Sequence, residues 1–347
     1  MRIELQARNR NFAFDVLDGE SILYAGMRQG LELPYGCATG TCGTCRVRCR
    51  EGRCESLWPE APGYGIGGED RGDVLMCQCT PAEDAVLETG ANVYEADPGA
   101  CLPDYAGGWI AMQQQLTRDV MAFSLEVDRP IDYEAGQFVA LRVPGIAGYR
   151  VYSMTNFAPG AGRLDFLVKR KPGGRFSDWL FDPAREGVRI EVFGPIGRAT
   201  FSPSAAKHLL IVAGGSGIAG MMAILERAVR DSYFERYRGE VFFGVRTWAD
   251  RFFVSELAAM QAGFPERLSV TVALSDEEVP PSAAARYPAL RFARGLVHEV
   301  AVGAMAGRCA DTRAYVAGPP EAVNAALRAL IRTAKLSPTD IRFDKFG

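Results

Sequence analysis

The alternation of apolar and polar residues near the N-terminus predicts two short strands followed by a helix. Arg2–Ala7 and Asn11–Val16 each alternate with a period of two, which is typical of half-buried strands, and their closeness favours a hairpin. Ser21 is then placed to cap a helix that runs to about Gln29, and Gly30 follows as its stop. We therefore expect a small strand-rich domain with one helix.

The pattern changes twice further along the chain. From about residue 109 to residue 203, strands follow one another closely without a long helical pattern, which predicts an antiparallel barrel. From residue 207 onward, buried strands alternate with helices, which predicts a doubly wound parallel sheet. The expected barrel strands are Ala122–Val127, Gln137–Val143, Arg150–Met154, Leu164–Lys169 and Val188–Phe193. The expected strands of the parallel sheet are His208–Ala213, Glu240–Val245, Ser269–Leu274 and Arg313–Ala317, with helices ending near Arg230, spanning about Phe253–Gln261 and following Pro320.

These patterns divide the 347 residues into three domains. The stretch from Glu95 to Gly107 is rich in proline and glycine and poor in apolar residues, so we interpret it as a linker. The predicted ranges are 1–95 for the strand-rich domain, 96–107 for the linker, 108–203 for the barrel and 204–347 for the parallel-sheet domain.

Composition and charge restrict the possible functions. The chain has 39 Lys and Arg against 42 Asp and Glu, and a net charge of −3 gives no reason to expect nucleic-acid binding. Its apolar runs are far shorter than the ~20 residues of a membrane span, and the N-terminus lacks the apolar core of a signal peptide. We therefore expect a cytoplasmic protein that binds neither membrane nor nucleic acid. Residues 1–105 alone have a net charge of −8, which predicts an acidic surface on the first domain.

Cysteine and histidine are unevenly used. Only two histidines are present, His208 and His298, which argues against a Rieske centre because that centre needs two histidine ligands. Seven of the nine cysteines lie between Cys37 and Cys79. An odd number of cysteines without a secretion signal does not indicate a disulfide framework, so the cluster favours a metal site.

The cysteine spacing indicates one kind of metal site. Cys37, Cys42 and Cys45 form C-x4-C-x2-C, and 31 residues separate Cys45 from Cys77, which is the plant-type pattern for a two-iron, two-sulfur cluster. A four-cysteine zinc site is the alternative, but it usually takes two short cysteine pairs, which the first spacing does not provide. Cys79 leaves the fourth ligand open, because in a strand it would face the same way as Cys77. Backbone N–H groups must come close to the sulfurs, and a Cβ would block this approach. We expect Gly36, Gly40 and Gly43 to allow it.

Residues 1–95 resemble the β-grasp ferredoxin domain at the N-terminus of bacterial oxygenase reductases. Besides the cysteine spacing, the stretches Ser56–Gly63 (SLWPEAPG) and Leu75–Cys79 (LMCQC) are similar to those of toluene monooxygenase and carbazole dioxygenase reductases. In that family the first cysteine of the C-x-C pair is a ligand. The resemblance therefore implies Cys77 as the fourth ligand, beside Cys37, Cys42 and Cys45.

Two short motifs in the predicted barrel carry the groups that a flavin needs. Arg150-Val151-Tyr152-Ser153 supplies a cation for the pyrophosphate, a flat aromatic face for the ring and a hydroxyl near N5. In Gly174–Ser177, a helix start beside Ser177 offers backbone N–H groups to the second phosphate. Together the motifs resemble the FAD domain of the ferredoxin–NADP reductase superfamily.

A strand, a glycine turn and a helix over Leu209–Ala219 indicate a dinucleotide site. The glycines let the backbone approach a pyrophosphate, which then lies at the helix N-terminus. The turn resembles the superfamily motif G-G-[ST]-G-[IL]-[AS]-P, with Gly220 in place of the proline, so the start of the helix is uncertain. The residues of this turn are Gly214, Gly215, Ser216 and Gly217.

Two further segments complete the resemblance. Ala317-Gly318-Pro319-Pro320 matches the family's second nucleotide motif, with Ala317 in place of the usual cysteine. Arg246 lies at the end of the second strand, where it would either contact a 2′-phosphate or stack on adenine. Because these two roles fit different dinucleotides, the preference for NADH over NADPH is implied only by the family resemblance. At the C-terminus, Phe346 is expected to cover the flavin face, with Asp344 in a supporting polar role.

The resemblance covers nearly the whole chain in the order ferredoxin, FAD, NAD. It implies a reductase that passes electrons from NADH through FAD and one two-iron, two-sulfur cluster to a terminal oxygenase or an intermediary ferredoxin. No side chain is expected to act as a catalytic acid or base. Two alternatives stay open: a reductase that serves a non-oxygenase partner such as a deoxysugar dehydratase, and a binding module with structural zinc.

Overall fold

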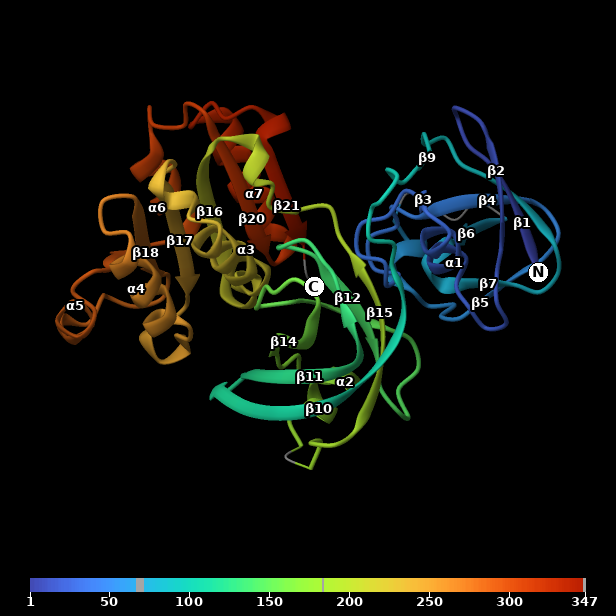
Figure 1. Cartoon of the computed structure of the whole chain (residues 1–347), viewed down its shortest axis with the longest axis horizontal. Coiled ribbons are helices and arrows are strands. Elements are labelled where there is room, and N and C mark those ends of the chain that lie inside the picture. Colours follow the sequence, from blue (N-terminus) through green and yellow to red (C-terminus); the bar gives the residue numbers. More distant parts are fainter. Residues whose placement is uncertain (67–71, 183, 346–347) are drawn as a thin grey trace. The chain divides into compact units, whose positions relative to one another are not determined.

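The structure contains two compact units. It is a computed structural model and describes residues 1–66, 72–182 and 184–345 (Figure 1). The first unit comprises Met1–Gly108, Phe138–Tyr152 and Arg189–Ile196. The second comprises Trp109–Gln137, Ser153–Val188 and Gly197–Gly347. Among the described residues, no helix is long and apolar enough to cross a membrane.

The first unit is built on a five-stranded sheet with the order β2-β1-β8-β4-β6. The predicted hairpin is confirmed: β1 and β2 pair antiparallel, and the alternation buries Ile3 and Leu5 of β1 on one face. Strand β8 pairs parallel with β1, which gives this sheet its mixed character. The strands are β1 (Arg2–Gln6), β2 (Asn11–Asp15), β4 (Arg46–Glu51), β6 (Asp73–Leu75) and β8 (Ala85–Glu88).

Helix α1 (Ile22–Arg28) crosses this unit and is buried along almost its whole length. The predicted cap is confirmed, because the Ser21 hydroxyl accepts the backbone N–H of Tyr24 at 3.3 Å. Gly30 follows the helix with a φ of +82°, a conformation that glycine adopts without strain. The cap and the stop therefore fix α1 in register and place Tyr24 inside the unit.

Short elements complete the unit around the cysteine loop. Strand β4 ends at Glu51, because Gly52 turns the chain with a φ of +80°. A Cβ at Gly52 would lie 2.4 Å from the carbonyl oxygen of Asp84, so only glycine fits there. The remaining elements are β3 (Leu31–Glu32) paired with β9 (Tyr94–Glu95), β5 (Cys54–Ser56) paired with β7 (Cys79–Pro81), and the 3-10 turns η1 (Pro62–Tyr64) and η2 (Met76–Gln78).

The predicted barrel is present as a curled six-stranded sheet with the order β13-β12-β15-β10-β11-β14. An antiparallel bridge between Met154, which follows β13, and Phe166 of β14 joins its two ends. The first strand was not predicted, and it begins at Asp104, inside the range assigned to the linker. The strands are β10 (Asp104–Thr117), β11 (Val120–Ile131), β12 (Phe138–Arg142), β13 (Arg150–Ser153), β14 (Ala161–Lys169) and β15 (Arg189–Ile196), with helix α2 (Arg175–Leu180) after β14.

The barrel strands are divided between the two units. Strands β12 and β15 belong to the first unit, whereas β11 and β14 belong to the second. Phe138, Ala140 and Phe193 of these first-unit strands share one buried core with the N-terminal sheet and α1. Since the units cut across the barrel, the sequence boundaries at residues 95, 107 and 203 stay a prediction.

The C-terminal part of the second unit is a six-stranded parallel sheet, as predicted. Its order is β19-β18-β17-β16-β20-β21, and β16 starts the chain's path at the centre of the sheet. Two of its strands, β19 and β21, were not predicted. The strands are β16 (His208–Gly214), β17 (Gly239–Val245), β18 (Leu268–Leu274), β19 (Arg291–Arg294), β20 (Thr312–Gly318) and β21 (Ile341–Lys345).

Helices cover this sheet (Figure 1). On one face, Leu210 and Val212 of β16 pack with Ala301 of α6 and Val323 of α7. Helix α3 contacts β16 and β20, and in the described chain it contributes no residue to that core, so it covers the opposite face. The fold class is therefore confirmed as doubly wound. The helices are α3 (Ile218–Arg230), α4 (Val254–Gly263), α5 (Pro281–Arg286), α6 (Val297–Met305) and α7 (Pro320–Arg332).

The cap of α1 is open to a direct test. Replacing Ser21 by Ala leaves the Tyr24 N–H without its acceptor, and we expect a loss of about 1 kcal/mol in the stability of α1. Amide hydrogen exchange should show faster exchange in α1 for Ser21→Ala, and Ser21→Thr should restore protection because its hydroxyl can cap. Equal protection in the Ala variant and the parent would contradict the capping role.

Candidate functional site

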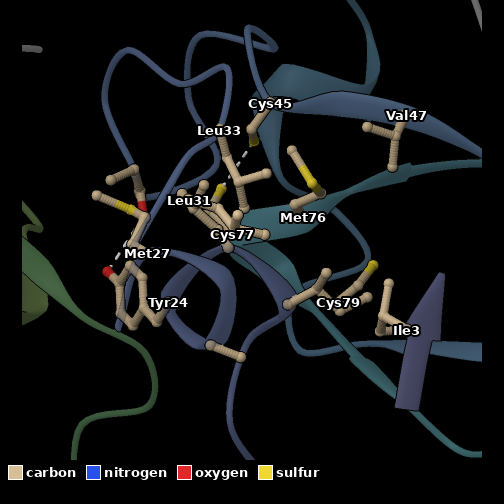
Figure 2. Packing of buried hydrophobic residues seen from close by; sticks show 14 of the residues in the cluster. Ile3, Tyr24, Met27, Leu31, Leu33, Cys45, Val47, Met76, Cys77 and Cys79 are labelled. Carbon is tan, nitrogen blue, oxygen red and sulfur yellow. Dashed lines mark hydrogen bonds between the residues drawn. The ribbon is translucent and has the colours of Figure 1, made fainter. Parts of the chain in front are cut away.

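The four predicted ligand cysteines lie in the first unit as two pairs. The sulfurs of Cys45 and Cys77 are 3.2 Å apart (Figure 2). Cys37 and Cys42 face each other through reciprocal contacts, in which the backbone N–H of each donates to the sulfur of the other at 3.3 and 3.4 Å. The pair Cys45–Cys77 is buried, whereas Cys37 and Cys42 are partly exposed. Two pairs of thiols provide two ligands for each iron of a two-iron cluster.

The expectation that Cys77 and Cys79 face the same way is wrong. Cys77 lies in the 3-10 turn η2, and Cys79 begins β7, so the two residues do not share one strand. The Cys79 sulfur lies 3.3 Å from the hydroxyl of Tyr64, while Figure 2 shows Cys77 directed toward Cys45. The turn thus separates two cysteines that sequence spacing alone leaves equivalent. The identity of the four ligands stays a prediction.

Backbone N–H groups surround the sulfur of Cys37. Thr39, Thr41 and Cys42 donate to it at 3.5, 3.3 and 3.4 Å. The thiol of Cys42 and these donors lower the pKa of the Cys37 thiol, whereas the contact with Cys37 raises the pKa of the Cys42 thiol, so within this pair the negative charge is favoured on the Cys37 sulfur. A Cβ at Gly36 would lie 3.1 Å from the Cys42 sulfur, so the glycine leaves the loop thin there, as expected. The residues present therefore fit a two-iron, two-sulfur cluster.

The first flavin motif forms strand β13, and its hydroxyl is unpaired. Ser153 is buried, and among the described residues its Oγ has no hydrogen-bond partner. A buried hydroxyl without a partner is costly unless a ligand supplies one, so this atom fits the expected contact with FAD. Arg150 and Tyr152 are partly buried, and the Arg150 guanidinium donates to the carbonyl of Tyr149 at 2.8 Å. Desolvation raises the pKa of Tyr152, which keeps its ring neutral.

The second flavin motif is a closed loop before α2. The Ser177 hydroxyl donates to the carbonyl oxygen of Gly174 at 3.0 Å and accepts the N–H of Lys171 at 3.1 Å. A Cβ at Gly174 would lie 2.8 Å from the carbonyl oxygen of Lys171, which explains the glycine. The hydroxyl thus shapes the loop before α2.

The glycine turn of the predicted dinucleotide site packs against the second nucleotide motif. A Cβ at Gly217 would lie 2.5 Å from the carbonyl of Ala317, so the two loops approach at backbone distance. By contrast, a Cβ at Gly214 or Gly215 would meet nothing within 4 Å, which leaves space beside the turn for a pyrophosphate. Ser216 lies between Gly215 and Gly217 in the turn, and Gly318 of the second motif has a φ of +152°.

The uncertain helix start and the role of Gly220 are both explained. Helix α3 begins at Ile218, after a 3-10 turn over Gly215–Gly217, so Gly220 lies inside the helix. A Cβ at Gly220 would lie 3.3 Å from the Cβ of Ser153. The departure from the proline pattern was the signal in the sequence for this contact, but only the fold identifies Ser153 as the neighbour.

The remaining predicted nucleotide residues lie at the ends of parallel strands. Arg246 follows β17 and is exposed. Nearby, the Asp250 carboxylate accepts the N–H and the hydroxyl of Thr247, at 3.1 and 2.9 Å, so it is already engaged. Asp344 pairs with Ala317 across β21 and β20, and desolvation raises the pKa of its carboxyl to about 7. Phe346 lies outside the described residues.

Aromatic side chains that no motif indicated pack between the cysteine loop and the barrel strands of the same unit. The Tyr24 ring stacks on Phe193 of β15 with centroids 4.2 Å apart, and Tyr149 packs edge-on against it at 5.2 Å. Their spacing along the chain carries no motif, because they come from three separate elements.

Comparison with known proteins gives consistent matches for all three parts. Family models match a 2Fe-2S iron-sulfur cluster binding domain at residues 6–82, an oxidoreductase FAD-binding domain at 109–201 and an oxidoreductase NAD-binding domain at 211–328. The ferredoxin–NAD(+) reductase component of the alkene monooxygenase system of Xanthobacter autotrophicus is 34% identical over 342 residues, which cover 97% of this chain and 99% of the relative. The phenol 2-monooxygenase reductase component of a Pseudomonas strain is 30% identical, covering 96% and 91%.

Solved structures show the same architecture over the full length. The ferredoxin reductase in carbazole 1,9a-dioxygenase has a TM-score of 0.82 and 27% identity, covering 100% of this chain and 99% of the other. An Amycolatopsis cytochrome P450 reductase has a TM-score of 0.80 and 28% identity, covering 99% and 98%. The fold and the three cofactor types expected from the sequence are thereby confirmed.

The two candidate fourth ligands can be separated by substitution. We expect Cys77→Ser to lose the cluster, because Cys77 pairs with Cys45 and an alkoxide is a poor replacement for a thiolate on iron. We expect Cys79→Ser to keep it, because Cys79 contacts Tyr64 instead. Iron content and visible absorption after anaerobic purification measure both. Iron lost only from the Cys79 variant would refute the assignment of Cys77.

The contact of the two nucleotide loops gives a second test. Gly217→Ala places a methyl group 2.5 Å from the Ala317 carbonyl, so we expect the loops to separate and the KM for NADH to rise about tenfold, about 1.4 kcal/mol. Flavin and iron content should not change. Gly303→Ala is the matched control, because a Cβ there meets nothing within 4 Å. An unchanged KM in the Gly217 variant would show that the loop contact does not shape the site.

Proposed function

The chain belongs to the family of iron–sulfur flavoprotein reductase components of bacterial multicomponent oxygenases, and on this premise we propose that its electron acceptor is the terminal component of such an oxygenase. It is an oxidoreductase that transfers electrons from NADH through FAD to a two-iron, two-sulfur cluster. The observation that carries the proposal is the full-length similarity to reductase components of alkene and phenol monooxygenases.

We propose that Arg150, Tyr152 and Ser153 hold FAD along β13. The Arg150 guanidinium can pair with pyrophosphate oxygens, and Tyr152 offers a ring face. The unpaired Ser153 hydroxyl supports a contact near N5 of the flavin. The loop from Gly174 to Ser177 would bind the second phosphate through its backbone N–H groups.

The dinucleotide would bind at the glycine turn after β16. The open backbone of Gly214 and Gly215 supports contact with the pyrophosphate, and Ser216 lies in the same turn. Gly217 lies against Ala317 and Gly318 of the second motif, and Pro319, which follows them and precedes α7, belongs to the same proposed site. Other residues in the proposed site are Arg246 beside the adenosine ribose, and Asp344 and Phe346 near the nicotinamide.

FAD supplies the step between two-electron and one-electron chemistry, because NADH gives up a hydride and a two-iron cluster accepts one electron at a time. Cys37, Cys42, Cys45 and Cys77 are the proposed cluster ligands. No acid or base is needed for these transfers, so the side chains bind, orient and exclude water. Asp344, whose pKa is raised to about 7, is assigned no proton-transfer role.

The nature of the acceptor rests on the relatives. Their names describe reductase components of alkene, phenol and xylene/toluene monooxygenases, and full-length coverage makes the same kind of partner the best proposal for this chain. An intermediary ferredoxin is the alternative first acceptor of the electrons. We also propose that the protein works in the cytoplasm, where NADH is available.

The acceptor can be tested with the purified protein. NADH should drive product formation by a terminal oxygenase component from the same organism, and Cys77→Ser should abolish this while ferricyanide, which draws electrons from the flavin, is still reduced. The acidic surface predicted for residues 1–105 implies that the coupled rate falls as salt rises. Efficient reduction of a deoxysugar dehydratase partner, and none of the oxygenase, would refute the proposal.

A further inference from the structure

Tyr24 is a single side chain that contacts both the cysteine loop and the barrel strands of the first unit. It is fully buried in α1, with 1% of its surface exposed. Its ring stacks on Phe193 with an interplanar angle of 9°, and its hydroxyl donates to the carbonyl oxygen of Ala38 at 3.2 Å. Figure 2 shows Tyr24 among the buried residues of this core. Neither contact is needed to form α1, because the helix hydrogen bonds and the Ser21 cap already do so.

The hydroxyl contact reaches a cluster ligand through one peptide group. Ala38 directly follows Cys37, and its carbonyl belongs to the same peptide as the N–H of Thr39. That N–H donates to the Cys37 sulfur at 3.5 Å. The peptide therefore accepts a hydrogen bond from Tyr24 on one side and donates one to sulfur on the other. Linked hydrogen bonds of this kind polarise one another, and hydrogen bonds to the sulfurs help to set the reduction potential of a cluster.

The position of this peptide is unusual, which makes an external anchor necessary. Ala38 has a φ of 55°, in the left-handed region that non-glycine residues rarely adopt. It is also buried, with 1% of its surface exposed, so its carbonyl oxygen needs a partner from the protein. The Tyr24 hydroxyl is that partner, and burial raises the pKa of Tyr24 well above its ordinary value, which keeps the hydroxyl a donor.

The ring contact reaches the proposed flavin strand. Tyr149 packs edge-on against the Tyr24 ring and directly precedes Arg150 of β13. Its hydroxyl donates to Glu191, which also accepts from Arg142, so Tyr149 is held in place. The Tyr24 ring therefore lies against side chains from β15 and from the residue before β13. Stacked aromatic pairs add roughly 0.5–1.5 kcal/mol beyond their buried area.

We propose that Tyr24 is a positioning residue for electron transfer from the flavin to the cluster. Its ring fixes the cysteine loop against the barrel strands of the first unit, and its hydroxyl orients the Ala38–Thr39 peptide toward the Cys37 sulfur. This inference rests on the proposed assignment of the flavin and cluster sites. The electron moves from reduced FAD to the oxidised cluster, and Tyr24 itself is neither oxidised nor deprotonated. Because electron transfer slows steeply with distance, a loosened loop slows this step alone.

Two substitutions separate the ring from the hydroxyl. Tyr24→Leu removes both contacts, and we expect the transfer from flavin to cluster to slow at least tenfold while flavin reduction by NADH and ferricyanide turnover stay at the parent rates. Tyr24→Phe keeps the stack, so it should restore most of the transfer rate. It should also lower the reduction potential of the cluster, because the peptide that donates to Cys37 loses its anchor. Stopped-flow absorbance at flavin and cluster wavelengths and a redox titration followed by electron paramagnetic resonance measure these effects.

Tyr64→Phe is the matched control. It removes a tyrosine hydroxyl from the same unit, which contacts Ser56 and the Cys79 sulfur, and should change neither the transfer rate nor the potential. A parent rate of transfer in iron-replete Tyr24→Leu, or an unchanged potential in Tyr24→Phe, would overturn the proposal. If Tyr24→Leu does not retain iron, the Phe variant alone decides. The transfer from flavin to cluster and the cluster potential are measured without an external partner. These tests therefore remain valid if the oxygenase is not the acceptor. Absence of any transfer from flavin to cluster in the parent would instead refute the proposed function.

Discussion

The first unit depends on a requirement of the four thiols: their sulfurs need backbone N–H groups close by, so the chain that supplies these groups must be thin. The loop after β3 meets this with glycine at Gly36, where a Cβ would crowd the Cys42 sulfur, and with Ala38 in a left-handed conformation. The hydrogen bond from Tyr24 of α1 to the Ala38 carbonyl satisfies the buried oxygen of this left-handed residue.

Close backbone approach is also the principle of the second unit. Gly217 lets the turn after β16 contact the end of β20, and Gly220 lets α3 approach Ser153. The space beside Gly214 and Gly215 exists because these contacts hold the turn open. In both units a site for a charged or electron-carrying group is formed where side chains are absent, and the neighbouring apolar core keeps the backbone there rigid.

The core of the first unit extends beyond the N-terminal sheet. Phe138 and Phe193 of the barrel strands share it with α1, and the Tyr24 ring lies between Phe193 and Tyr149. Electron transfer between two groups depends on the distance between them. Packing in a shared core fixes the positions of the residues around the two groups better than a surface contact does. The cysteine loop and the segment from Phe138 to Tyr152 are thus parts of one compact unit.

The order of the parts, the fold class and the chemistry can be predicted from the amino-acid sequence, because they depend on short-range patterns: the C-x4-C-x2-C spacing, the R-x-Y-S and glycine motifs, and the change of periodicity near residue 207. The position of Cys77, rather than Cys79, beside Cys45 follows from the three-dimensional structure, since the 3-10 turn there depends on the surrounding core. The three-dimensional structure also decided that Gly220 faces Ser153 and that Tyr24 reaches Ala38. These contacts join residues far apart in the chain, and their geometry follows from how whole elements pack, which no local pattern encodes.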